Sequence, residues 1–137
     1  MIKLNEFVPG GYITSPIGYR MRAGNREYHR GIDIGTQNVK NEIYCPIMGT
    51  VFLMGFSESF GNRIWVKVAN QEYYVLAHLE SLNVKLHHGL IIAPSMLIGI
   101  MGHSGFSAGK HLHWEFRKDP SSPETSFESE YQKSLIV

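Results

Sequence analysis

The sequence predicts an all-β domain built mainly from antiparallel strands, with little helix. Fourteen glycines and six prolines interrupt the chain every few residues, which leaves little room for a regular helix. Between them lie short runs of β-branched and aromatic residues, which are typical of strands. Closely spaced strands separated by turn residues favour an antiparallel sheet over a fold of alternating strands and helices.

The expected strands begin near residue 43. Residues 43–54 are predicted to form two short strands around a turn. Further strands are predicted at residues 64–68, 73–79, 97–101 and 111–117. The first two of these flank residues 69–72, a connection short enough for a hairpin. Residues 81–88 are expected to contain at most one helical turn.

The two ends differ from the middle of the chain. Residues 1–12 are expected to form a loop-like lead-in, residues 13–118 the folded domain, and residues 119–137 a polar tail rich in proline and serine. The last three residues, Leu135, Ile136 and Val137, are apolar, so this end has the composition to dock back onto the domain.

Size and composition limit the classes of function. A chain of 137 residues suffices for one domain with a hydrophobic core. A formal charge of +1, without a basic stripe, argues against nucleic-acid binding. Cys45 is the only cysteine, which excludes an internal disulfide and a cysteine-rich zinc cage; we expect it to be a small buried residue. No segment approaches the roughly 18 apolar residues of a membrane span, so membrane insertion is not expected.

Four histidines and one aspartate fall into short clusters that suit a zinc hydrolase. His29 and Asp33 flank Arg-Gly-Ile, His111 and His113 flank a leucine, and His78 lies between these clusters. Imidazole and carboxylate are the usual ligands of a zinc ion that keeps one position open for water. On a strand, both rings of a His-x-His pair point to the same face. His29, Asp33 and one histidine of the pair would hold the metal, and the remaining two histidines would serve acid–base catalysis.

Simpler interpretations apply to the other histidines. His87 and His88 are adjacent, so on a strand their rings face opposite ways and cannot enter one site. His103 lies in a Gly/Ser-rich loop, where it could at most touch a substrate. The spacing of four between His29 and Asp33 would place both on one helix face, but the neighbouring residues favour a loop-to-strand segment instead.

Three motifs in order carry a family resemblance: His29–Asp33, Leu76–Leu79 and Gly102–Glu115. Together they resemble the lysostaphin-type, LytM-like zinc endopeptidases, a family of peptidoglycan hydrolases. Supporting blocks lie at residues 13–20, 45–51 and 61–66, so that the resemblance spans about residues 11–117.

The resemblance implies a site and a fold. His29, Asp33 and His113 would be the ligands of one Zn²⁺ per chain. His78 and His111 would be the catalytic pair that handles the nucleophilic water and the developing oxyanion. The family's fold implies a twisted antiparallel sheet whose groove, walled by loops, holds an extended peptide. We expect these walls near residues 19–28, 56–61 and 101–110.

The implied activity is hydrolysis of the peptide cross-links or stem peptides of bacterial peptidoglycan. The alternative is a non-catalytic wall-binding or activator module, since some family members have lost zinc ligands. All five groups are present here, which favours the enzyme. A carrier or structural domain with incidental histidines is a third class. The sequence departs from the family at Lys110, where proline is frequent, at Trp114, where phenylalanine is frequent, and over residues 86–96.

The first ten residues contain no apolar core region and no small-residue cleavage site, so a secretory signal is not expected. A small cell-wall enzyme without a leader resembles a bacteriophage endolysin or a tail-tip enzyme domain. The expected setting is therefore the host cytoplasm before release to the wall, or the virion tail. Further domains, or phage tail or lysis proteins, are the partners that such a setting offers. The scissile bond stays open among glycine bridges, D-Ala–Gly and D-Ala–diamino-acid linkages.

Overall fold

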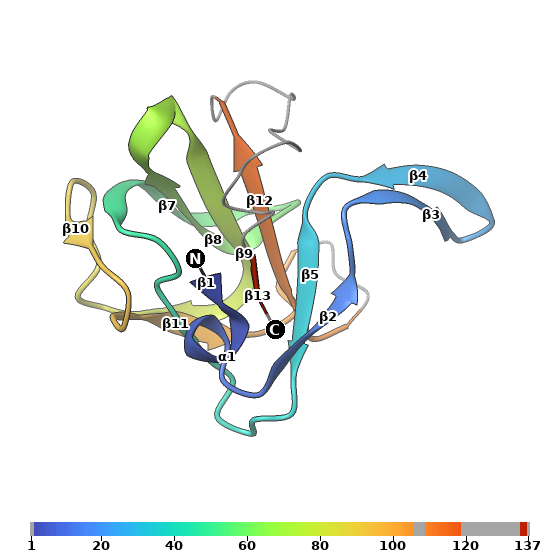
Figure 1. The fold of residues 1–137 in the computed structure, drawn as a ribbon, viewed down its shortest axis with the longest axis horizontal. Coiled ribbons are helices and arrows are strands. Elements are labelled where there is room, and N and C mark those ends of the chain that lie inside the picture. Colours follow the sequence, from blue (N-terminus) through green and yellow to red (C-terminus); the bar gives the residue numbers. More distant parts are fainter. Residues whose placement is uncertain (1, 106–108, 119–134, 137) are drawn as a thin grey trace.

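The protein forms one large antiparallel sheet with a two-stranded hairpin projecting from it (Figure 1). The computed structural model describes residues 2–105, 109–118 and 135–136. The large sheet has nine strands, and every pairing within it is antiparallel. The predicted all-β class is therefore confirmed. No helix among the described residues has the length and apolar character to cross a membrane.

Seven strands follow one another across the large sheet. In spatial order they are β10 (Ile91–Ile92), β7 (Gly49–Ser57), β8 (Gly61–Lys67), β9 (Tyr73–Leu82), β12 (Leu112–Arg117), β5 (Ile32–Thr36) and β2 (Gly11–Ser15). The two remaining strands are β6 (Glu42–Tyr44) and β11 (Leu97–Met101). β11 pairs with β6 on one side and with the far end of β9 on the other.

The strands expected between residues 43 and 117 are confirmed. The β8–β9 hairpin closes through a short 3₁₀ helix, η1 (Ala69–Gln71). The helical turn considered for residues 81–88 is not formed, because residues 81 and 82 extend β9 and the residues after them make turns.

The expected loop at residues 1–12 is wrong, because this segment belongs to the folded core. It contains β1 (Ile2–Lys3) and a one-turn helix, α1 (Leu4–Phe7). Leu4, Phe7 and Val8 are buried, and the ring of Phe7 meets Trp114 edge-on at a centroid distance of 5.1 Å. β13 (Leu135–Ile136) pairs with β1 in parallel, so the chain end docks back onto the domain. The tail expected at residues 119–134 lies outside the described residues.

The large sheet buries one face and presents the other to the site. Along β12, Leu112, Trp114 and Phe116 enter the main core, while His113, Glu115 and Arg117 point to the opposite face. This is the period-two alternation of a strand. Other core members come from most of the remaining strands and include Ile34, Ile43, Val51, Ile64, Val66, Leu76 and Leu79. Cys45 is buried in this core, as predicted.

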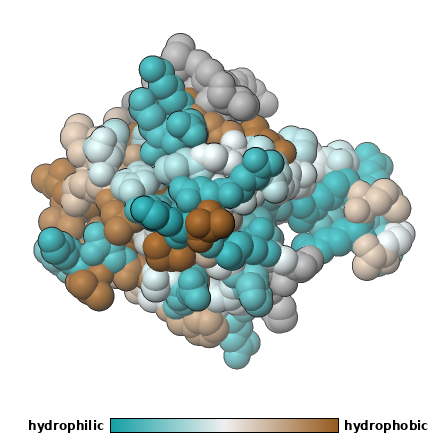
Figure 2. Space-filling view, turned by 90° about the horizontal axis from the view of Figure 1, so that it is seen from below, coloured by the Kyte–Doolittle hydropathy of each residue, from teal (hydrophilic) through white to brown (hydrophobic). Residues whose placement is uncertain are grey.

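The projecting hairpin consists of β3 (Gly18–Arg22) and β4 (Asn25–His29). It extends away from the body of the molecule, and Figure 2 shows the same projection as a mainly hydrophilic arm. On this arm the rings of Tyr19 and Tyr28 meet edge-on at 4.9 Å, and the guanidinium of Arg26 lies 4.0 Å from the Tyr19 ring centroid. The arm therefore holds its shape through aromatic and cation–π contacts.

His78 occupies a distorted position within β9. Its φ is +65°, in the left-handed region, and it lies at a bulge where two residues of β9 face one of β8. Before it, β9 pairs with β12 up to Ala77; after it, β9 pairs with β11 from Leu79. The backbone N–H of His78 donates to the Phe60 carbonyl (2.7 Å), and its carbonyl accepts from the Gly102 N–H (3.1 Å). Such strain persists only where the surroundings impose it.

Substitutions at residue 78 are expected to reveal this strain. Both His78→Gly and His78→Ala remove the ring, but only glycine adopts a positive φ without cost, so the glycine variant should be more stable by about 1 kcal/mol. Chemical denaturation of both variants measures the difference. The same pair at Glu80, an exposed residue of β9 with ordinary φ, should show the opposite order. An alanine variant at residue 78 that is as stable as the glycine variant would contradict the assigned strain.

Candidate active site

Three side chains meet on the outer face of the large sheet. His29 Nε2 lies 3.2 Å from Asp33 Oδ1 and 3.4 Å from His113 Nδ1, and the last two atoms are 2.9 Å apart. Asp33 and His113 are direct partners in the register of β5 and β12. His29 ends β4, and the two-residue link Arg30–Gly31 returns the chain to β5. The predicted loop-to-strand geometry of this motif is therefore confirmed as a strand–link–strand segment.

This triangle of atoms fits a tetrahedral metal ion. With zinc–ligand bonds of about 2.0–2.1 Å, two ligand atoms of a tetrahedron lie about 3.3 Å apart. The three observed separations lie close to that value. The three residues form the one group among the described residues whose histidine and carboxylate atoms are placed to hold a metal ion.

Contacts behind the triangle orient His29 and Asp33. His29 Nδ1 lies 2.9 Å from the Pro16 carbonyl, to which it donates, so Nε2 faces the triangle. Arg20 Nη1 donates to Asp33 Oδ2 (3.2 Å), which leaves Oδ1 toward the histidines. Burial opposes ionisation of Asp33, but its hydrogen bonds to His113 and His29 outweigh burial and hold the pKa of this carboxyl far below its usual value.

His113 is oriented by a buried acidic partner. Its Nε2 donates to Glu115 Oε1 (2.8 Å), and Glu115 Oε2 accepts from Arg117 Nε (2.9 Å). Burial disfavours the charged imidazole, but hydrogen bonds to Asp33 and Glu115 raise the pKa of His113 to about 9. The Arg117 guanidinium lies over the rings of Phe60 and Trp65. A carboxylate behind a histidine ligand fixes its tautomer and raises its basicity.

The other two predicted histidines lie beside the triangle. The His78 and His111 ring centroids are 5.2 Å apart, and His111 Nε2 lies 3.6 Å from Asp33 Oδ1. His78 Nδ1 donates to the Ser104 carbonyl (2.6 Å), and His111 Nδ1 donates to the Gly109 carbonyl (3.0 Å). Both rings are thus held through Nδ1. Burial lowers the pKa of His78, so its imidazole is neutral at neutral pH.

Two glycines allow the backbone approaches on which this geometry depends. A Cβ on Gly31 would lie 2.6 Å from the Trp114 carbonyl oxygen and 2.9 Å from His113 Cε1, so any side chain there would displace His113. A Cβ on Gly61 would overlap the backbone and hydroxyl of Ser104. Ser104 Oγ in turn donates to the Leu79 carbonyl (2.6 Å) and accepts from the Asn62 N–H (3.0 Å), which fixes the carbonyl that holds His78.

Four of the five site residues, Asp33, His78, His111 and His113, line a groove of about 490 Å³, called here the active-site groove; His29 is buried and does not line it. Its lining residues are Thr14, Arg20, Met21, Arg22, Asp33, Ser59, Phe60, His78, Gly109, Lys110, His111 and His113. Each of the three predicted walls contributes to it. A second cavity of about 440 Å³, lined in part by Glu80, His103 and Ser104, shares Lys110 with the groove.

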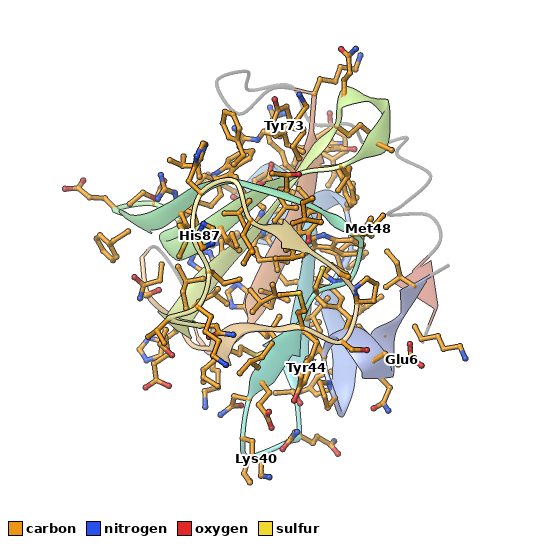
Figure 3. All side chains as sticks on the ribbon, turned by 90° about the vertical axis from the view of Figure 1, so that its left-hand side faces the viewer. Glu6, Lys40, Tyr44, Met48, Tyr73 and His87 are labelled. Atoms are coloured by element: carbon orange, nitrogen blue, oxygen red, sulfur yellow. The ribbon has the colours of Figure 1, made fainter. Side chains whose placement is uncertain are left out.

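The structure thus brings together every residue predicted for the site and leaves out the histidines interpreted as incidental. His87 and His88 are exposed on the loop before β10, on the side of the molecule away from the β3–β4 arm; Figure 3 views the molecule from that side and labels His87. His103 is exposed and lines only the second cavity.

Sequence reasoning missed Arg20 and Glu115 as positioning residues. Glu115 carried a usable signal, because it follows His113 by two residues and shares its strand face. Arg20 carried none, because it contacts Asp33, 13 residues along the chain, only in the folded structure.

An all-β domain with a histidine–aspartate–histidine group and two further histidines in one groove has the architecture of a metallopeptidase. The chain belongs to peptidase family M23, whose family model matches residues 27–125. The resemblance to lysostaphin-type enzymes that the motifs indicated is confirmed.

Individual relatives in sequence and structure are consistent with membership of this family. The chain is 34% identical over 115 residues to the L-Ala–D-Glu endopeptidase of Bacillus subtilis (strain 168), an alignment that covers 77% of the chain and 34% of that protein. It therefore spans about a third of that relative's length. The catalytic domain of EnpA, a prophage-encoded M23 protein of Enterococcus faecalis, has a similar fold, with a TM-score of 0.75, 23% identity, and coverage of 88% of this chain and 91% of that one. The catalytic domain of lysostaphin from Staphylococcus simulans gives a TM-score of 0.65 and 25% identity, with coverage of 82% and 81%.

The raised pKa of His113 predicts how metal-free protein responds to pH. An unfolded histidine titrates near 6.5 and folded His113 near 9, so between these values the folded state holds a proton that the unfolded state has lost. The free energy of unfolding should therefore fall as pH rises from 6.5 to 9, by at most about 1.4 kcal/mol per pH unit. Denaturant titrations with a chelator present measure this slope.

Glu115→Gln should flatten the slope, because it removes one of the two charges that raise the pKa of His113. Glu6→Gln is the matched control, since Glu6 is exposed on α1 and does not line the active-site groove. Equal slopes in the Glu115 variant and the unmodified protein would show that Glu115 does not act on His113.

Proposed function

We propose that this protein is a zinc-dependent endopeptidase that hydrolyses peptides of bacterial peptidoglycan, either cross-links or stem peptides. The observation that carries the proposal is the geometry of the groove floor: three ligand atoms face one point, and two imidazoles held through Nδ1 lie beside them. Family membership supports it, because M23 enzymes are metalloendopeptidases that use zinc. The name of the Bacillus relative, an L-Ala–D-Glu endopeptidase, supports a peptide substrate of the wall.

In this proposal His29 Nε2, Asp33 Oδ1 and His113 Nδ1 hold one Zn²⁺ per chain. When bound, zinc supplies a lowered pKa for a water molecule and polarises the scissile carbonyl. A three-ligand site leaves a fourth position, which here would face the active-site groove. When His113 is protonated, its Nδ1 donates to Asp33 and its Nε2 to Glu115, so metal binding at Nδ1 requires loss of the Nδ1 proton.

His78 and His111 are proposed as the acid–base pair. Because Nδ1 of each ring donates to a backbone carbonyl, Nε2 is the atom that can accept or donate a proton in the groove. A neutral His78 can take a proton from the attacking water or, once protonated, stabilise the developing oxyanion. The centroids of the two rings lie 5.2 Å apart, His111 Nε2 lies 3.6 Å from Asp33 Oδ1, and the His78 ring centroid lies 6.1 Å from that of His113.

A non-catalytic wall-binding or activator module is the alternative. It would have no need for two imidazoles fixed in one tautomer beside an intact ligand set. The enzyme is favoured because each of the five side chains is separately oriented by a partner on its far side.

Alanine variants are expected to separate ligands from catalysts. His78→Ala and His111→Ala should keep one zinc per chain and lose about 10²- to 10⁴-fold in wall-lytic rate, because each removes a proton-transfer group. His113→Ala should lose zinc. Metal analysis and turbidity assays on cell walls measure both quantities, and His87→Ala, exposed on the β10 side, is the matched control. Zinc loss in the His111 variant with zinc retained in the His113 variant would reverse the assignment.

The products should identify the bond class. Digestion of purified peptidoglycan is expected to release new amino termini and no new reducing ends, because Asp33 is the single acid in the described lining of the groove and glycan cleavage needs a pair. A chelator should abolish the activity, and added zinc should restore it. Mass spectrometry of the fragments then gives the scissile bond. New reducing ends without new amines would indicate a glycosidase, and neither product would favour the binding module.

A further inference from the structure

The active-site groove carries an excess of positive charge outside its metal group. Three of its lining residues are cationic, namely Arg20, Arg22 and Lys110, whereas Asp33 is its one acidic lining residue. Arg20 is committed to its neighbours, because it donates to Glu27 (2.7 Å), Ser15 (2.8 Å) and Asp33 (3.2 Å). The other two cations, Arg22 and Lys110, are not held in this way.

Among the residues that the structure describes, neither Arg22 nor Lys110 is matched by an acid of its own. Arg22 shares Glu27 with Arg20, and its 3.7 Å separation is the longer of the two; half of its side chain is exposed. Lys110 is exposed and makes no ion pair with the described residues. Both line the same groove, Arg22 from the β3–β4 arm and Lys110 from the segment immediately before His111.

A bound divalent metal would strengthen this imbalance, because it would more than offset the single charge of Asp33. An uncharged peptide, such as a glycine bridge, offers nothing to these cations. A peptide with a free carboxylate would be drawn into the groove and held by them. Glu80 lines the neighbouring cavity rather than this one, which places the favourable position for a carboxylate in the active-site groove.

We infer that the peptide taken by this groove carries a free carboxylate close to the scissile bond, and that Arg22 and Lys110 bind it. The inference rests on the proposed peptidase function and narrows its substrate to acidic stem peptides in preference to glycine bridges. Arg22 and Lys110 are then specificity residues that contact the substrate from two different parts of the groove lining, Arg22 from the β3–β4 arm and Lys110 from the segment before His111.

The test uses three probes: two cross-linked stem-peptide dimers that differ only in a free glutamate α-carboxylate or its carboxamide, and pentaglycine. The zinc-loaded protein should cut the carboxylate dimer with a kcat/KM about tenfold above that of the carboxamide dimer, and pentaglycine least, since exposed charge pairs contribute modestly. The preference should fall at high salt. Binding of each probe to the His111→Ala variant is measured in parallel.

Substitutions at Arg22 and Lys110 test whether these two residues cause the preference for the carboxylate dimer. Arg22→Gln and Lys110→Gln should each reduce the carboxylate-to-carboxamide ratio, and Lys110→Glu should bring it to one or below, with zinc content unchanged. Arg26→Gln is the matched control, because Arg26 lies on the same arm but stacks on Tyr19 and does not line the groove. Equal cleavage of both dimers, faster cleavage of pentaglycine, or a ratio unaffected in both groove variants would overturn the inference.

Measuring both cleavage and binding shows whether a negative result counts against the proposed peptidase function or only against the preference for a carboxylate. If none of the probes and no cell wall is cut, the peptidase proposal fails, yet tighter binding of the carboxylate dimer would still support the charge preference. If walls are cut but the two dimers bind and react equally, the peptidase proposal stands and the charge preference fails.

Discussion

The antiparallel register between β5 and β12 is the constraint on which the site depends. It sets Asp33 directly opposite His113, so that a carboxylate oxygen and an imidazole nitrogen lie 2.9 Å apart. A slip of either strand by one residue would turn its own site residue to the core face and bring Ile34 or Leu112 outward in its place. The buried residues on either side of the pair prevent that slip. The packing of the core therefore fixes the register, and the register fixes the geometry of the metal group.

Hydrogen bonds on the far side of each ligand residue orient the metal group further, beyond what the strand register sets. His29 is held by a carbonyl, Asp33 by Arg20 and His113 by Glu115, so each ligand atom is aimed by a hydrogen bond on its far side. Such partners fix tautomers and lower the cost of ordering the site when metal binds. The strained backbone of His78 belongs to the same pattern, because the sheet changes its pairing there and turns the ring toward the groove.

Local pattern was sufficient to predict most of the fold and all five site residues. Strand runs, turn residues and the His-x-His alternation are short-range signals, and they gave the class, the central strands and the shared face of His111 and His113. The ligand role of His113 over His111 came from the family resemblance alone. The segment at residues 1–12 was misjudged because Leu4 and Phe7 form one helical turn, too short for a periodic signal, and are ordered by packing on Trp114. Arg20 was missed because it reaches Asp33 only through the folded arm.

The alternation along β12 also separates the physical roles of its residues. Trp114 and Phe116 secure the sheet to its core, while His113 and Glu115, one position away, face the groove. Because backbone pairing couples the two faces, a core substitution that shifts β12 would displace His113 as well, whereas a polar substitution on the outer face need not disturb packing. A change in core packing would thus alter the metal geometry, whereas a change of an outer-face side chain can leave the core packing as it is. That asymmetry explains how groove residues such as Lys110 can depart from the family pattern while the five central side chains keep their places.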